Sequence, residues 1–85
     1  MRVTHTATNN FICKYYYNNV IKQEVIDAFP DELYLHVVSQ INNYNNNPNN
    51  KTLSYDQFTY WLFNKLDELY SEEISKFKNT IKRIK

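Results

Sequence analysis

Hydrophobic residues recur at steps of three and four through residues 53–70, which is the pattern of a helix with one buried face. Ser54 precedes the stripe and Gln57 lies three residues later, so the pair predicts a capping box at the start of this helix. We therefore expect a helix that begins at the Ser54 cap. Its apolar stripe comprises Tyr55, Phe58, Leu62, Leu66 and Leu69.

The turn at residues 60–63 is apolar on every side. A turn of this kind is usually buried on more than one side, so Trp61 and Leu62 are both expected in the core. The full set of predicted core residues is Ile26, Val37, Ile41, Phe58, Trp61, Leu62 and Leu66.

A second apolar stripe continues to the C-terminus and predicts one long helix over residues 54–85. The stripe comprises Phe63, Leu66, Tyr70, Ile74, Phe77, Ile81 and Ile84. About thirty helical residues would extend roughly 45 Å, whereas a compact chain of this size has a radius of gyration of about 12 Å. The helix therefore either breaks, with Ser71 as the favoured point, or projects and pairs with another chain.

Residues 19–43 predict two further helices, separated by Pro30. The first covers residues 19–29 and the second residues 31–43, because apolar positions recur with helical spacing in both. The apolar side of the first comprises Val20, Ile21, Val25, Ile26 and Phe29. Asparagine dominates residues 44–53 and competes with helical hydrogen bonding, so we interpret this stretch as an exposed loop.

Residues 1–18 leave two interpretations open. Alternating β-branched residues followed by aromatic ones favour a short β-hairpin that turns at Asn9 and Asn10. The rival interpretation is a helix from Asn10 to Phe29, and it gains weight because an isolated two-stranded ribbon is only marginally stable. The sequence thus predicts one small, mainly α domain over residues 1–85, with three helices, the last of them long, and an N-terminal hairpin on the first interpretation.

Composition adds a constraint on the turns. Glycine is absent and asparagine is abundant. Asparagine tolerates the left-handed conformation better than most residues, so we expect it at turn positions with positive φ. The preference for Asn, Lys, Ile and Tyr over Ala, Gly and Arg also indicates an AT-rich genome, as in low-GC bacteria, their phages and plasmids.

Charge and cysteine content indicate the class of protein only loosely. The net charge of +1 gives no overall attraction to nucleic acid or to a membrane surface. Cys13 is the single cysteine, so the chain forms no internal disulfide, which fits a reducing compartment. The sequence contains no membrane-spanning run and no signal-peptide pattern. We expect a cytoplasmic protein that does not bind membranes.

Catalytic and metal-binding motifs are weak in this sequence. Cys13 and His36 could form a Cys–His nucleophile pair, but no glycine-rich loop or oxyanion-hole motif accompanies them. Metal-ligand spacings of the CxxC or HxxxH type do not occur, and the absence of glycine excludes phosphate-binding loops. We therefore expect no enzymatic activity, no metal and no cofactor.

Two groups of residues are candidates for binding a partner: Tyr15, Tyr16 and Tyr17 near the N-terminus, and Lys76, Lys78, Lys82 and Arg83 near the C-terminus. Three consecutive tyrosines in regular structure leave at least one ring facing outward, and tyrosine is enriched at interfaces, although AT-rich coding also raises its frequency. A basic, acid-free helix end is commonly a solvated terminus stabilised by the helix dipole, and the alternative is a contact with nucleic acid or an acidic protein.

The leading functional hypothesis is a non-enzymatic protein-binding module that regulates or inhibits a larger protein. The size, composition and lack of catalytic motifs are typical of small phage-encoded or accessory inhibitors as a broad category. The competing hypothesis is a nucleic-acid-binding regulator that uses the basic C-terminal helix, with tyrosines stacking on bases. The second apolar stripe also allows a homo-oligomer formed through that helix.

Overall fold

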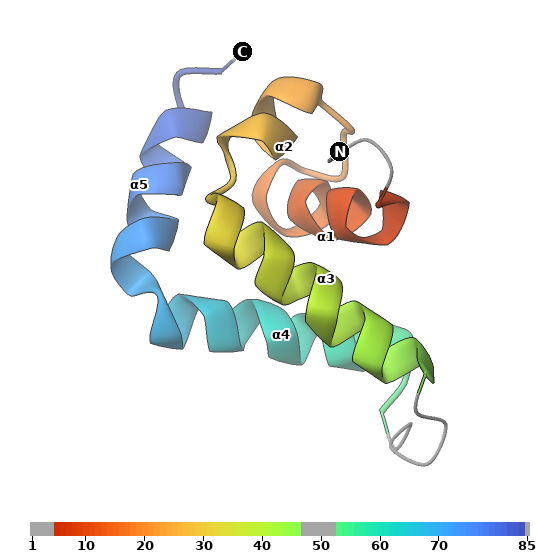
Figure 1. The fold of residues 1–85 in the computed structure, drawn as a ribbon. Helices are drawn as coiled ribbons and strands as arrows, with labels where there is room; N and C mark the ends of the chain where they lie inside the picture. Colours follow the sequence, from red (N-terminus) through yellow and green to blue (C-terminus); the bar gives the residue numbers. More distant parts are fainter. Residues whose placement is uncertain (1–4, 47–52, 85) are drawn as a thin grey trace.

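The computed structural model describes residues 5–46 and 53–84, and every regular element in these ranges is an α-helix. The helices are α1 (Thr6–Tyr16), α2 (Gln23–Ala28), α3 (Asp31–Asn46), α4 (Tyr55–Leu69) and α5 (Ser71–Ile81). In Figure 1, α4 runs along the bottom of the molecule and α3 crosses it, while α1 and α2 lie above and α5 rises along the left side. The mainly α prediction is therefore confirmed for the described residues.

The N-terminal hairpin predicted within residues 1–18 is wrong, because residues 6–16 form helix α1. Asn9 and Asn10 lie inside this helix, and the Asn9 side chain accepts a hydrogen bond of 2.8 Å from the Tyr34 hydroxyl on α3. Phe11 and Ile12 are both buried in the core. Burial of one helical face against α3 outweighs the local β preference of these residues, because a lone ribbon could not bury the same surface.

The rival helix from Asn10 to Phe29 is also wrong in its bounds. The N-cap is His5, whose Nδ1 accepts a 3.3 Å hydrogen bond from the Thr8 backbone N–H. At the other end, Asn18 and Asn19 have φ of 52° and 68°, so the chain reverses before α2. These are the left-handed asparagines that the glycine-free composition predicts.

Helix α2 is shorter than the predicted helix over residues 19–29. It begins at Gln23, and Val20 and Ile21 remain exposed in the connection that precedes it. Helix α3 is longer than the predicted 31–43 and continues to Asn46. The predicted loop over residues 44–53 therefore starts later, and its residues 47–52 lie outside the described residues.

The predicted capping box at the start of α4 is confirmed. Ser54 Oγ accepts a hydrogen bond of 3.2 Å from the Gln57 backbone N–H, and the Ser54 N–H donates one of 3.0 Å to Gln57 Oε1. Tyr44 links the end of α3 to the start of α4. Its hydroxyl donates a hydrogen bond of 2.6 Å to the Leu53 carbonyl, and its ring stacks on that of Phe58 with a centroid distance of 4.5 Å.

We expect Ser54→Ala to lower the free energy of unfolding by about 1 kcal/mol, because one terminal N–H loses its acceptor. Urea denaturation monitored by circular dichroism measures this change. Ser39 is exposed inside α3, so Ser39→Ala removes a hydroxyl without removing a cap and serves as the control. An equal midpoint for Ser54→Ala and the unchanged protein would show that the cap contributes nothing.

The single C-terminal helix predicted over residues 54–85 is wrong. Helical geometry is interrupted at Tyr70, with φ −129° and ψ 42°, and α5 begins at Ser71, the favoured break point. The turn directs α5 back toward α2, as Figure 1 shows, and it places Ile74 and Phe77 in the core. A straight helix would leave both of these side chains in water, so their burial favours the bend.

The core contains six of the seven predicted residues. Ile26, Val37, Ile41, Phe58, Leu62 and Leu66 are all buried. The prediction for Trp61 is wrong, because 45% of this residue is exposed, whereas its neighbour Leu62 is fully buried. The α4 face that carries Leu62 packs inward, and Trp61 lies on the flank of the helix, where its ring is 6.2 Å from that of Phe58.

Candidate interaction surfaces

The candidate residue Tyr15 has a structural role. Its ring stacks on Phe63 of α4 at 4.9 Å, and its hydroxyl lies 2.8 Å from Thr59 Oγ1. Thr59 uses its only hydroxyl hydrogen on the Asp56 carbonyl, at 3.1 Å, so Tyr15 is the donor to Thr59. Tyr15 therefore ties α1 to α4 while part of its surface remains exposed.

Tyr16 and Tyr17 are also half-buried against the core. The Tyr16 ring makes edge contacts with Phe63 at 5.3 Å and with Phe77 at 5.1 Å. Burial raises the pKa of the Tyr16 phenol well above its ordinary value, and the Asp67 carboxylate raises it further. The Tyr16 hydroxyl has no hydrogen-bond partner within the described part of the chain. No tyrosine of this triplet is a purely external side chain.

The four basic residues of the C-terminal segment are all exposed, but they do not form one helical face. Lys76 and Lys78 lie in α5, Lys82 is its C-cap, and Arg83 follows the cap. Because they are two residues apart in a helix, Lys76 and Lys78 point to nearly opposite sides. Lys78 pairs with Asp67 of α4 at 3.6 Å.

The structure brings four of the seven candidate residues together around one hollow between the end of α1 and α5, which we call the α1–α5 hollow. It has a volume of about 260 Å³ and is lined by Tyr15, Tyr16, Lys78, Ile81 and Lys82. Tyr17, Lys76 and Arg83 do not line it. No sequence spacing could have indicated this site, because its two halves are more than sixty residues apart.

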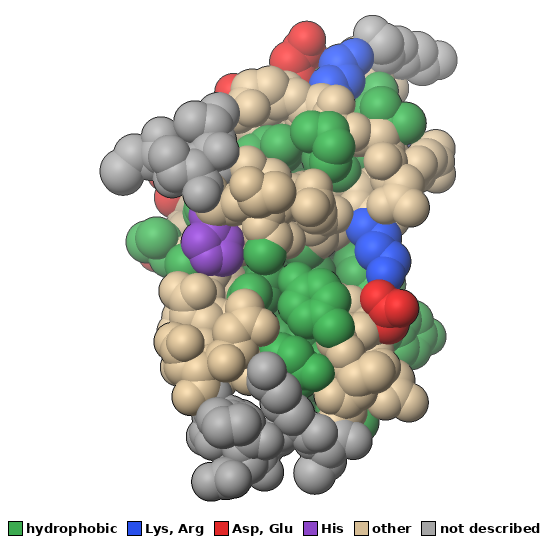
Figure 2. Space-filling view, turned by 90° about the vertical axis from the view of Figure 1, so that its right-hand side faces the viewer, with side chains coloured by type: hydrophobic (Ala, Val, Ile, Leu, Met, Phe, Trp, Pro, Cys, Tyr) green, Lys and Arg blue, Asp and Glu red, His purple; other side chains and the backbone are tan. Residues whose placement is uncertain are grey.

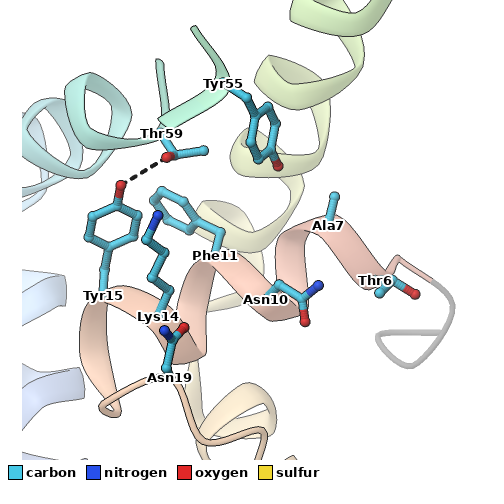
Figure 3. A pocket seen from close by; sticks show the side chains of 9 residues that line it. All are labelled: Thr6, Ala7, Asn10, Phe11, Lys14, Tyr15, Asn19, Tyr55 and Thr59. Carbon is cyan, nitrogen blue, oxygen red and sulfur yellow. Dashed lines mark hydrogen bonds between the residues drawn. The ribbon is translucent and has the colours of Figure 1, made fainter. Parts of the chain in front are cut away.

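A larger depression, the α1–α4 groove, lies between α1 and the first turns of α4 (Figure 3). Its volume is about 540 Å³, and its lining residues are Thr6, Ala7, Asn10, Phe11, Lys14, Tyr15, Asn19, Tyr55 and Thr59. In Figure 3, Tyr55 faces α1 across the groove, and Phe11 and Tyr15 form the wall on the α1 side. Lys14 lies at the rim, where its Nζ is 3.3 Å from Asp56 Oδ1.

The charged side chains on this side of the molecule lie at its periphery. Figure 2, which shows the right-hand side of Figure 1, has hydrophobic side chains gathered near its centre and acidic and basic side chains toward its top and edges. Sequence reasoning missed this groove, because Tyr55 was expected on the buried stripe and is instead 40% exposed. Tyr55 comes directly after the Ser54 cap, and this position could have indicated its exposure, since the first turn of a helix often extends past the core.

Two further aromatic residues of α4 are exposed, Tyr60 by 60% and Trp61 by 45%. Tyr60 lines neither the groove nor the hollow. Large aromatic side chains left in water are frequent anchors of protein interfaces. They therefore add a third candidate contact region, on the outer flank of α4.

The residues considered for chemistry are placed apart from these surfaces. Cys13 is fully buried in the core, and the His36 ring packs 6.0 Å from that of Tyr70. His5 acts as a helix cap. Within residues 5–46 and 53–84 no group of three His, Cys, Asp or Glu side chains could hold a metal ion. In the same ranges, no helix combines the length and the hydropathy needed to cross a bilayer.

Comparison of the chain with protein-family models, with curated proteins and with solved structures finds no match.

Proposed function

We propose that this chain is a non-enzymatic protein-binding module that regulates or inhibits a larger protein. The observation that supports it best is the α1–α4 groove, an open depression of about 540 Å³ whose lining includes the partly exposed Tyr15 and Tyr55. Pockets that hold drug-sized molecules have volumes of about 300–1,000 Å³, so a depression of this size has room for side chains of a partner.

The lining of the groove suits a peptide segment of a protein. Tyr15 and Tyr55 offer apolar ring surface, and Asn10 and Asn19 offer amide groups that can bond to a peptide backbone. Tyrosine provides a large contact area for little loss of conformational entropy. The ion pair between Lys14 and Asp56 at the rim has an acid that is 84% exposed, so the pair can rearrange at small energetic cost.

The test uses Tyr55→Ala, which removes one wall of the groove, and Tyr60→Ala as the matched control on the same helix. Both variants and the unchanged chain serve as bait in a lysate of the source organism at moderate salt, once with and once without nuclease treatment. The proposal is supported if the unchanged chain and Tyr60→Ala retain the same partner. The amount that Tyr55→Ala retains should be lower by at least about tenfold. Circular dichroism confirms that each bait is folded.

Loss with Tyr60→Ala alone would move the contact to the outer flank of α4 and contradict the groove as its location. Recovery of nucleic acid only, with no nuclease-resistant protein, would contradict the protein-binding function itself. Alanine at Tyr15, Tyr16 or Tyr17 is a poor test, because each packs against the core and its loss would change stability as well as binding.

The second candidate function is a nucleic-acid-binding regulator, favoured by the exposure of Lys76 and Lys78 in α5 and of Lys82 and Arg83 directly after it. Phosphate contacts release counterions, so the affinity of this mode of binding would fall steeply as salt rises and by similar factors for each lysine removed. The nearly opposite directions of Lys76 and Lys78 on α5 weigh against it, since a phosphate backbone follows one continuous basic surface.

A further inference from the structure

The α1–α5 hollow combines apolar walls with positive charge. Tyr15, Tyr16 and Ile81 supply the walls, and two ammonium groups come from Lys78 in the last turn of α5 and Lys82 at its C-cap. Its volume of about 260 Å³ suits one or two side chains rather than a whole peptide segment. A site with this lining favours a ligand group that is anionic at its tip and apolar along its stem.

The positive charge of the hollow is only partly neutralised. Asp67 lies 3.6 Å from Lys78 and compensates one ammonium group. Lys82 has no ion pair within the described residues. Residues 76–84 contain no Asp or Glu, and the two acids of α5, Glu72 and Glu73, lie in its first turn, at the end of the helix away from Lys82. An incoming carboxylate would therefore meet an uncompensated cation beside apolar surface.

We propose that the α1–α5 hollow receives an acidic side chain of the partner protein, with an aliphatic or aromatic neighbour of that side chain packed against Tyr15 and Ile81. The proposal deepens the protein-binding function and rests on it. A carboxylate gains a charge-assisted hydrogen bond from Lys82, and its stem replaces water over the tyrosine ring. Tyr15 lines both the hollow and the α1–α4 groove, so one extended segment of a partner can occupy both.

The local geometry favours an acidic protein segment over a nucleic acid. Lys78 and Lys82 line one small hollow, whereas Lys76 and Arg83 do not. A nucleic acid would engage basic residues in a row along its backbone, and it would depend on all of them to a similar degree. A single acidic side chain would depend on Lys82 and be nearly indifferent to Lys76.

The experiment compares Lys82→Glu with Lys76→Glu. Both substitutions change the charge equally and affect exposed residues, Lys76 within α5 and Lys82 at its C-cap, but only Lys82 lines the hollow. Random peptides displayed on phage are selected on the unchanged chain, and the enriched sequences are synthesised with a fluorescent label. Their affinity for the three proteins is measured by fluorescence anisotropy. Labelled oligothymidylate is measured in parallel at increasing salt, and circular dichroism checks the fold.

We expect the enriched peptides to share an acidic residue beside an aliphatic or aromatic one. We expect Lys82→Glu to weaken them by about tenfold or more, and Lys76→Glu by less than about threefold. Enriched peptides without an acid, equal losses in the two variants, or no enrichment would each overturn the proposal. Tight, salt-sensitive binding of oligothymidylate with equal losses in both variants would assign the surface to nucleic acid instead. If a Tyr55-dependent partner is captured while Lys82→Glu changes nothing, the proposed function stands and only this inference fails.

Discussion

Replacing Phe77 with alanine is expected to lower the free energy of unfolding by about 3–5 kcal/mol. Phe77 is only 2% exposed, and its ring makes edge contacts with Tyr16 at 5.1 Å and with Phe29 at 5.0 Å. Its removal leaves a cavity between α1, α5 and the end of α2, and the surrounding rings lose their contact partner. The loss is a fifth or more of the stability of a typical small domain.

Urea denaturation with circular dichroism detection measures this change, and Lys76→Ala is the control. Lys76 is the exposed neighbour on the same helix, so its substitution should change the stability by no more than about 0.5 kcal/mol. Because Phe77 is buried only when α5 folds back, the comparison tests the bend at Tyr70 directly. Similar small effects of the two substitutions would mean that α5 projects from the domain.

The second large effect is expected at Leu62. Leu62→Ala should lower the free energy of unfolding by about 2–5 kcal/mol, because the side chain is fully buried at the centre of α4. Trp61→Ala should lower the free energy of unfolding by less, about 1 kcal/mol, although tryptophan is much the larger residue. Trp61 is 45% exposed, and its ring contact is an offset stack on Phe58 at 6.2 Å.

A comparison of these two variants, at adjacent residues, shows which side of α4 faces the core. The same denaturation experiment applies to both variants, and the slope of the transition shows whether the native state has remained compact. A larger loss for Trp61→Ala than for Leu62→Ala would reverse the assignment of the two faces. It would also remove the outer flank of α4 from the candidate contact regions.

The candidate site was predictable only in its parts. The tyrosine triplet and the basic C-terminal residues were identified from their unusual clustering, but neither cluster forms a surface alone. Tyr15 and Lys82 line one hollow because α5 returns to α1 after the bend. Lys76 and Arg83 do not line that hollow. The apolar stripe that suggested a homo-oligomer packs within the chain, where Ile74 and Phe77 are buried, so it no longer supports that prediction.

The sequence by itself determined those features that depend on a few neighbouring residues. The capping box at Ser54 needs one hydroxyl and one amide three residues apart. The composition also predicted asparagine at positions with positive φ, although it did not single out Asn18 and Asn19. Helical spacing likewise identified Leu62 and Leu66 as core residues, because one face of a helix must pack against something. Each of these is a short-range interaction whose partners are visible in the sequence.

The tertiary structure decided the conformation of those segments for which the local sequence allows more than one. The first eighteen residues have sequence support for both strand and helix, and burial of Phe11 and Ile12 against α3 selected the helix. The turn at residues 60–63 is apolar all round, so either the side with Leu62 or the side with Trp61 could have faced the core. The packing of α4 buried Leu62 and left Trp61 partly exposed. The bend at Tyr70 follows from the burial of Phe77, which lies against Tyr16 of a helix that comes sixty residues earlier. Contacts between segments so distant in the chain give no local signal, and therefore only the assembled core could show which surfaces remain open to a partner.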